Sequence, residues 1–162
     1  MQRTSILFAV AICLAELGGG SPAGEKKPFQ HSADETKIFE LTNQERKTKK
    51  VAALVLSPAL SKIARAHSEN MARQGKTAHV LDEKDYDDRV RDAGYKFTAL
   101  AENVGSGGGG ATLEMIMKAW MDSEGHRVNI LNADYTEVGV GLARDANGRV
   151  YATQIFAHPR KK

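Results

Sequence analysis

The sequence predicts an α+β domain in which helices pack on a small antiparallel sheet. Apolar residues recur at spacings of three and four in the first three quarters of the chain, as in amphipathic helices. Val138, Val140 and Leu142 then alternate with other residues, and a second apolar strand is predicted over residues 150–156. An Asn-Gly pair at residues 147–148 is typical of the turn in an antiparallel hairpin. Because the strands follow the helices, no strand-helix-strand repeat is predicted.

The first helix is predicted to begin at residues 32–35, which have the Ser-x-x-Glu spacing of a capping box. Its buried face carries Ile38, Leu41 and Thr42. We expect it to end in the lysine-rich stretch near Lys50.

The second helix has a clear start and a clear end. Ser57 is expected to cap it, and Pro58 fits the first turn, where its missing amide hydrogen would have no partner. Gly75 suits a left-handed stop. His67 lies on the apolar face and is expected to be a hydrogen-bonded core residue. The apolar face consists of Leu60, Ile63, Ala64, His67 and Met71.

Two more helices and one strand are predicted between these helices and the hairpin. A short helix covers residues 85–93 and ends at Gly94, and a short strand covers residues 100–104. The glycines at residues 107–110 predict a loop, because glycine loses much backbone entropy in a helix or strand. A further helix begins at Thr112. The inward-facing side chains are expected to be Tyr86, Val90 and Ala93 in the first of these helices and Leu113, Ile116, Met117 and Trp120 in the second.

Residues 1–23 have the pattern of a signal peptide. An apolar run at residues 6–14 is too short to span a bilayer, which needs about 20 residues. We therefore expect a secreted, periplasmic or extracellular protein with no transmembrane segment. Cys13, the only cysteine, lies in the apolar run, so the mature chain is expected to be disulfide-free. Lipid attachment at Cys13 is disfavoured because Ile12 precedes it instead of a small residue.

The remainder divides into a flexible segment (24–33), one compact domain (34–157) and a basic tail (158–162). The chain has 162 residues with 23 basic and 20 acidic side chains, and its excess of three equals the last three residues. The cationic cluster at residues 46–50 lacks the interleaved aromatic residues that stack on bases. We interpret it as a solvated helix end and expect no nucleic-acid partner.

The most informative motif lies at residues 120–131, where a tryptophan-bearing helix is followed, past a serine, by Gly-His-Arg-x-Asn-Ile-Leu. It resembles the SCP-like pattern of the CAP superfamily (cysteine-rich secretory proteins, antigen 5 and pathogenesis-related proteins), in its cysteine-free bacterial form. The resemblance extends in order over residues 34–157. The other residues that carry the resemblance are Asn43, Arg46, Leu60, Ala64, His67, His79, residues 101–105, Tyr135, residues 138–141 and residues 151–156.

The resemblance implies an α-β-α sandwich with a cleft in which two histidines and two glutamates hold a divalent metal. His79 and His126 match the histidines, and Glu102 matches the first glutamate. Ser123 stands at the position of the second glutamate, and Glu124 beside it is turned by about 100° around the helix. The implied cleft therefore contains these five residues, with His79, Glu102 and His126 as the metal set.

Each part of this cleft has an alternative reading. The three metal candidates suit zinc, but they also suit mutual hydrogen bonds that stiffen the cleft. Ser123 and His126 have the spacing of a nucleophile and its base, although a helix-capping serine is favoured. Arg127 and Asn129 are expected to tie the loop after the helix that begins at Thr112 to the sheet. Residues 105–110 match Gly-x-Gly-x-x-Gly, but without a βαβ unit we expect no nucleotide cofactor.

Two functions follow from this reading. The first is a binding module for a lipid, a peptide or a cell-envelope component, with no turnover. The alternative is a metal-assisted extracellular hydrolase of the peptidase or esterase type, in which the site polarises a water molecule. A wall-associated structural protein, held through the basic tail, is a third interpretation.

Overall fold

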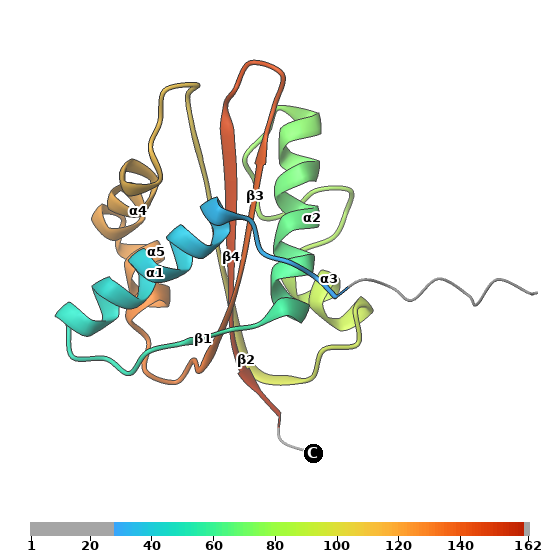
Figure 1. The fold of residues 1–162 in the computed structure, drawn as a ribbon. Helices are drawn as coiled ribbons and strands as arrows, with labels where there is room; N and C mark the ends of the chain where they lie inside the picture. Colours follow the sequence, from blue (N-terminus) through green and yellow to red (C-terminus); the bar gives the residue numbers. More distant parts are fainter. Residues whose placement is uncertain (1–27, 161–162) are drawn as a thin grey trace, which may run out of the picture.

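The computed structural model describes residues 28–160, so the predicted signal peptide, Cys13 and the last two residues of the tail lie outside the described residues. Within this part, five helices pack on a four-stranded sheet (Figure 1). The elements are α1 (Ala33–Thr48), β1 (Val55–Leu56), α2 (Pro58–Gln74), α3 (Tyr86–Asp92), β2 (Phe97–Gly107), α4 (Leu113–Asp122), α5 (Glu124–Leu131), β3 (Glu137–Arg144) and β4 (Val150–Pro159).

The sheet has the strand order β1-β3-β4-β2 and is mixed. β4 pairs antiparallel with both β3 and β2, which confirms the predicted hairpin. β1 adds a parallel pair with β3, so the sheet is not purely antiparallel. The sequence does not reveal β1, because two residues are too few to show an alternation. β2 forms one edge of the sheet, and this edge positions the candidate site.

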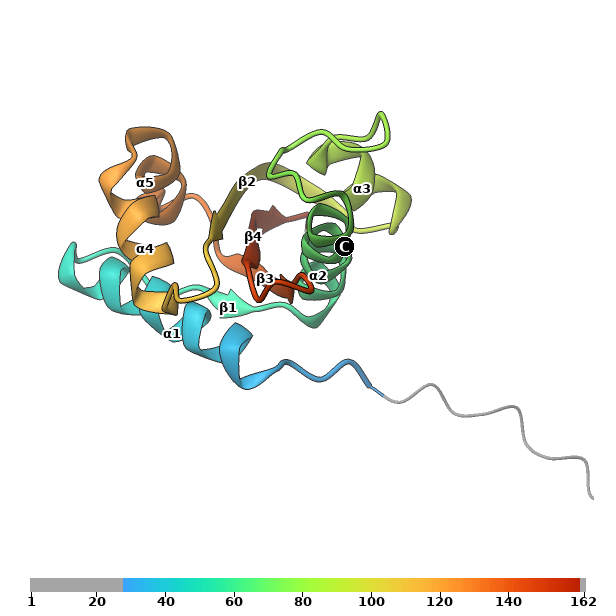
Figure 2. The same ribbon diagram turned by 90° about the horizontal axis from the view of Figure 1, so that it is seen from above.

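Helices cover both faces of the sheet, which gives an α-β-α sandwich (Figures 1 and 2). α1, α4 and α5 lie on one face, and α2 and α3 lie on the other. The central strand β4 contributes side chains to the cores on both faces of the sheet, since successive side chains of a strand point to opposite faces. Ala152 and Phe156 join the core with Trp120, whereas Ile155 packs with Leu60 of α2.

The helix boundaries follow mostly from local signals. The predicted capping box is present, because the Ser32 hydroxyl accepts from the Glu35 amide and the Glu35 carboxylate accepts from the Ser32 amide. Gly75 ends α2 with φ of 64°, as predicted. Ser57 stands at the N-cap of α2, but its side chain makes no capping hydrogen bond. Ala93 is exposed and not inward, since α3 ends one residue earlier.

Two other expectations are corrected. The strand predicted at residues 100–104 is longer and includes Gly107, because continuous pairing with β4 extends it. Arg46, expected in a solvated helix end, is fully buried. Its guanidinium donates to the backbone oxygens of Ala52 (2.7 Å), Ile130 (2.8 Å) and Asn132 (2.8 Å), so the charge is satisfied internally.

α2 packs directly on the backbone of β3. A Cβ atom at Gly139 would lie 2.3 Å from the carbonyl carbon of Leu60, and one at Gly141 would lie 2.0 Å from the amide nitrogen of Arg65. The alternating residues Val138 and Val140 point to the other face of the sheet and are fully buried there. The Val-Gly-Val-Gly motif therefore combines close helix contact on one face with a packed core on the other.

Candidate functional site

The site begins with Glu102, a buried carboxylate on the edge strand β2. Glu102 pairs in register with Ile155, whose side chain packs against α2, so the carboxylate faces the α2–α3 layer. Its Oε1 atom lies 2.9 Å from Nδ1 of His79, in the loop after α2. The His79 side chain is 47% exposed, whereas the Glu102 side chain is fully buried. The structure thus brings together two of the five predicted site residues.

Arg89 of α3 completes this cluster. Its Nη2 atom donates to Oε2 of Glu102 at 2.5 Å. Its Nη1 atom donates to the backbone oxygens of His79 and Lys84, both at 2.9 Å. The Arg89 side chain is only 13% exposed. It therefore contacts both the backbone of His79 and Glu102, the carboxylate that holds the His79 ring.

Sequence reasoning missed Arg89, although a signal was present. Glu102 lies in an apolar strand, and a buried carboxylate requires a positive partner or several hydrogen-bond donors. Arg89 follows Tyr86 by three residues, so it belongs on the side of the helix predicted to face inward. The exposed Arg91 points elsewhere and pairs with Asp87 at 2.7 Å.

The contacts of Glu102 define the hydrogen-bonding state of His79. A carboxylate that pairs with Arg89 is an acceptor, so Nδ1 of a neutral His79 carries the ring proton and donates it. Nε2 is then left as an acceptor on a ring that is nearly half exposed. The buried pair therefore presents one oriented nitrogen lone pair to solvent.

His126 reaches the same strand from the other layer. It lies in α5 and lines a cavity of about 160 Å³ together with Trp120 and Ser123. Burial lowers the pKa of His126, and the nearby His79 lowers it further. Its buried Nδ1 atom has no hydrogen-bond partner within the described part of the chain. His79 and His126 thus come from elements in opposite layers, and their rings share no hydrogen bond within residues 28–160.

Buried amides fix α5 to β2 beneath His126. Asn103, fully buried, donates to the His126 backbone oxygen and to Oε1 of Gln154, both at 3.1 Å. Asn129 donates to Oδ1 of Asn103 at 2.9 Å, in keeping with its expected structural role. Arg127 corrects its expectation: residues 124–131 form the helix α5 and not a loop, and Arg127 donates to the Met121 oxygen of α4 at 2.7 Å instead of holding the sheet.

Ser123 and Glu124 stand at the junction of α4 and α5. Ser123 takes the N-cap position of α5 without a side-chain capping bond. Glu124 is exposed in the first turn of α5. Among residues 28–160, no three His, Cys, Asp or Glu side chains are grouped so as to hold a metal ion.

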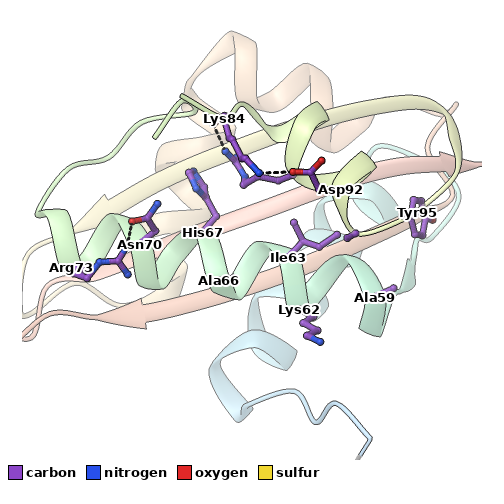
Figure 3. Close-up of a pocket in the computed structure, with 12 residues that line it drawn as sticks. Ala59, Lys62, Ile63, Ala66, His67, Asn70, Arg73, Lys84, Asp92 and Tyr95 are labelled. Atoms are coloured by element: carbon purple, nitrogen blue, oxygen red, sulfur yellow. Dashed lines mark hydrogen bonds and ion pairs between the residues drawn. The ribbon is translucent and has the colours of Figure 1, made fainter. Parts of the chain in front are cut away.

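His67 is a buried core residue, as predicted, with 2% exposure. Its Nε2 atom lies 2.9 Å from the Ala78 oxygen, and burial is the main cause of its lowered pKa. His67 also borders an open groove of about 640 Å³ between α2 and α3, shown in Figure 3. Most of the groove's polar side chains are already paired, for example Lys84 with Asp92 at 2.5 Å.

Comparison with known proteins identifies the family to which this chain belongs. Residues 39–156 match the model of the cysteine-rich secretory protein (CAP) family, and the chain belongs to that family. It is similar to YkwD of Bacillus subtilis, with 37% identity over 130 residues. The match covers 80% of this chain and 49% of YkwD, so the chain spans about half the length of that relative.

Solved structures show the same fold. An extracellular SCP-domain protein from Bacillus anthracis superposes with a TM-score of 0.71 at 26% identity, covering 86% of this chain and 45% of that one. An outer surface protein from Borrelia burgdorferi superposes with a TM-score of 0.72 at 18% identity, covering 78% of this chain and 93% of that one. These relatives are extracellular or outer surface proteins, and the family is secretory. None of the helices within residues 28–160 has the length and apolarity needed to cross a membrane.

Proposed function

We propose that this extracellular CAP domain is a binding module whose ligand lies along the edge strand β2 and contacts His79. The single observation that carries the proposal is the contact between His79 and the buried Glu102, itself paired with Arg89. A side chain held by a buried ion pair is pre-organised, so little conformational entropy is lost when it contacts a ligand. The ligand class is a peptide, a lipid or another component of the cell envelope.

The orientation of His79 specifies the contact it makes. Its free Nε2 atom accepts a hydrogen bond, so the ligand supplies an O–H or N–H donor. On the other side of β2, the cavity beside His126 and Ser123 has room for a small group of the ligand. His126 is neutral at neutral pH because its pKa is lowered, so this wall carries no imidazolium charge. Both features favour an uncharged ligand group.

The residues present do not fit a protein-chelated divalent metal. Both oxygens of Glu102 are engaged, one by Arg89 and the other by His79. Glu124 is exposed, so it supplies no second carboxylate beside Glu102. The structure of NaASP2 with Zn²⁺ superposes with a TM-score of 0.57, but at 14% identity the comparison carries the fold alone. We therefore assign no step to a metal.

One observation favours a hydrolase as the second candidate. A carboxylate that orients an imidazole, as Glu102 orients His79, is the arrangement that activates a water molecule or a serine. Ser123 is partly buried beside His126 and makes no hydrogen bond with either histidine within the described residues. The pair therefore has an oriented base but no positioned protein nucleophile.

The test is ligand-dependent thermal stabilisation of the mature protein. The probes are solubilised bacterial muropeptides, a short neutral peptide and phosphatidylglycerol vesicles, whose head groups carry hydroxyl donors. We expect one probe to raise the melting temperature of the native protein, to be recovered unchanged, and to lose its effect with His79→Ala. His158→Ala is the matched control, since His158 contacts the Asp134 oxygen at 2.7 Å, away from Glu102. His79-dependent cleavage of a probe would favour the hydrolase, and no His79-dependent response would refute the binding site.

A further inference from the structure

The ion pair at the edge of the sheet places a positive charge where a metal would need access to the carboxylate. Arg89 Nη2 lies 2.5 Å from Glu102 Oε2, and the other oxygen of Glu102 contacts His79. We propose that Arg89 is the specificity-determining residue of this site, a resident cation that excludes divalent metals and keeps His79 available to uncharged hydrogen-bond donors. This role rests on the proposed binding function for its choice of ligand, whereas the engagement of both Glu102 oxygens, which removes Glu102 as a metal ligand, rests on the contacts alone.

The first step is the charge. A guanidinium is always protonated in proteins, so its charge compensates Glu102 at every pH at which the protein is folded. A divalent ion bound to Glu102 Oε2 would lie beside this cation in a buried setting, where like charges repel strongly. The ion would therefore have to displace Arg89.

The second step is the anchoring of Arg89, which resists displacement. Its Nη1 atom donates to the backbone oxygens of His79 and Lys84, which begin and end one loop. Between them, Asp82 and Glu83 have φ values of 53° and 59°, in the left-handed region that non-glycine residues seldom adopt. Removing Arg89 would release both the carboxylate and this loop, so the guanidinium is held by more than one contact.

The third step is the consequence for ligands. With Arg89 in place, the exposed part of the cluster is the imidazole of His79, and its free nitrogen is an acceptor. Hydroxyl and amide N–H groups satisfy that acceptor without bringing a charge close to the guanidinium.

The experiment is a calorimetric titration of the mature protein with Zn²⁺, repeated with Arg89→Met and Arg91→Met. Arg91 is the matched control because it lies on the same helix, is exposed and pairs with Asp87. We expect the native protein and Arg91→Met to show no His79-dependent zinc binding. Arg89→Met is expected to bind Zn²⁺ at least about tenfold more tightly, and His79→Ala in that background is expected to abolish the gain.

A second measurement keeps the test decisive if Arg89→Met does not fold. Nitrogen-15 spectra of the histidine rings in the native protein report directly whether Zn²⁺ contacts His79. An unchanged His79 ring during the titration supports the exclusion, and a shifted ring with micromolar affinity overturns it. Because zinc is titrated without any other ligand, failure of this test is distinguishable from failure of the muropeptide, peptide and vesicle tests of the binding function.

Discussion

Arg89 and Glu102 form an ion pair that is almost removed from solvent, with 13% of one side chain and none of the other exposed. A buried pair of this kind contributes less net stability than its attraction suggests, because both charges lose hydration. Breaking it by removing one partner is costly, since the remaining charge stays buried without compensation. The pair therefore links the stability of the domain to the geometry of His79.

The first prediction concerns this pair. Arg89→Met is expected to lower the free energy of unfolding by about 3–5 kcal/mol, because it leaves Glu102 buried and unpaired. Arg91→Met is expected to change it far less, because its pair with Asp87 is exposed and screened by solvent. Urea denaturation measures both. A loss from Arg89→Met no larger than that of the control would contradict the role of the pair.

The second prediction is a pH dependence of stability from two histidines. Burial lowers the folded-state pKa of both His67 and His126 below 6.5, so the unfolded chain binds protons more readily than the fold. Their contribution is fully present above pH 6.5 and is lost as the pH falls below that value. Urea denaturation at about pH 7.5 and about pH 5.5 checks this. A stability that rises on this acidification would show that the sign is wrong.

The third prediction concerns the contact between α2 and β3. Gly141→Ala is expected to cost about 1–3 kcal/mol or more, because its Cβ atom would meet the backbone of Arg65 at 2.0 Å. Gly125→Ala is the control, since a Cβ atom there meets nothing within 4 Å and alanine favours the helix. Thermal unfolding of both variants distinguishes the two effects. Equal melting temperatures would contradict the close packing of α2 on the strand.

The fourth prediction concerns the buried amides beneath His126. Asn103→Leu is expected to cost about 1–3 kcal/mol, because it leaves the buried Oε1 atom of Gln154 without its donor and removes the oxygen that accepts from Asn129. It is also expected to loosen α5, since Asn103 donates to the His126 oxygen. Hydrogen exchange of the α5 amides measures the loosening. Protection of α5 equal to that of the native protein would show that Asn103 does not hold this helix.

Local signals explain which parts of the fold were predictable from sequence. The capping box at Ser32 and Glu35 and the left-handed Gly75 act through neighbouring residues, and both are confirmed. The short strand β1 is paired through a partner more than 80 residues away, so it has no local signal. Arg46 was misread for the same reason, because the oxygens of Ile130 and Asn132 that satisfy it are distant in sequence.

The candidate site, like the fold, could be predicted only in part from the sequence. His79, Glu102 and His126 were predicted from resemblance, and spacing alone gives no reason for residues 23 positions apart to touch, as His79 and Glu102 do. The need of Glu102 for a cation follows from its apolar strand, but the choice of Arg89 depends on how α3 packs beside β2. The predicted inward side of the helix limits which cations could pair with Glu102, and the packing of α3 beside β2 determines that Arg89 does so.

The central claim is that Glu102 holds His79 with its proton on Nδ1 and its acceptor nitrogen toward solvent. Long-range nitrogen-15 correlation spectra of the histidine rings, recorded above about pH 8 so that the imidazoles are neutral, measure this tautomer directly. We predict one fixed Nδ1–H form for His79 in the native protein and a mixture of tautomers in Glu102→Gln. A native His79 that carries its proton on Nε2, or that exchanges freely between tautomers, would contradict the account.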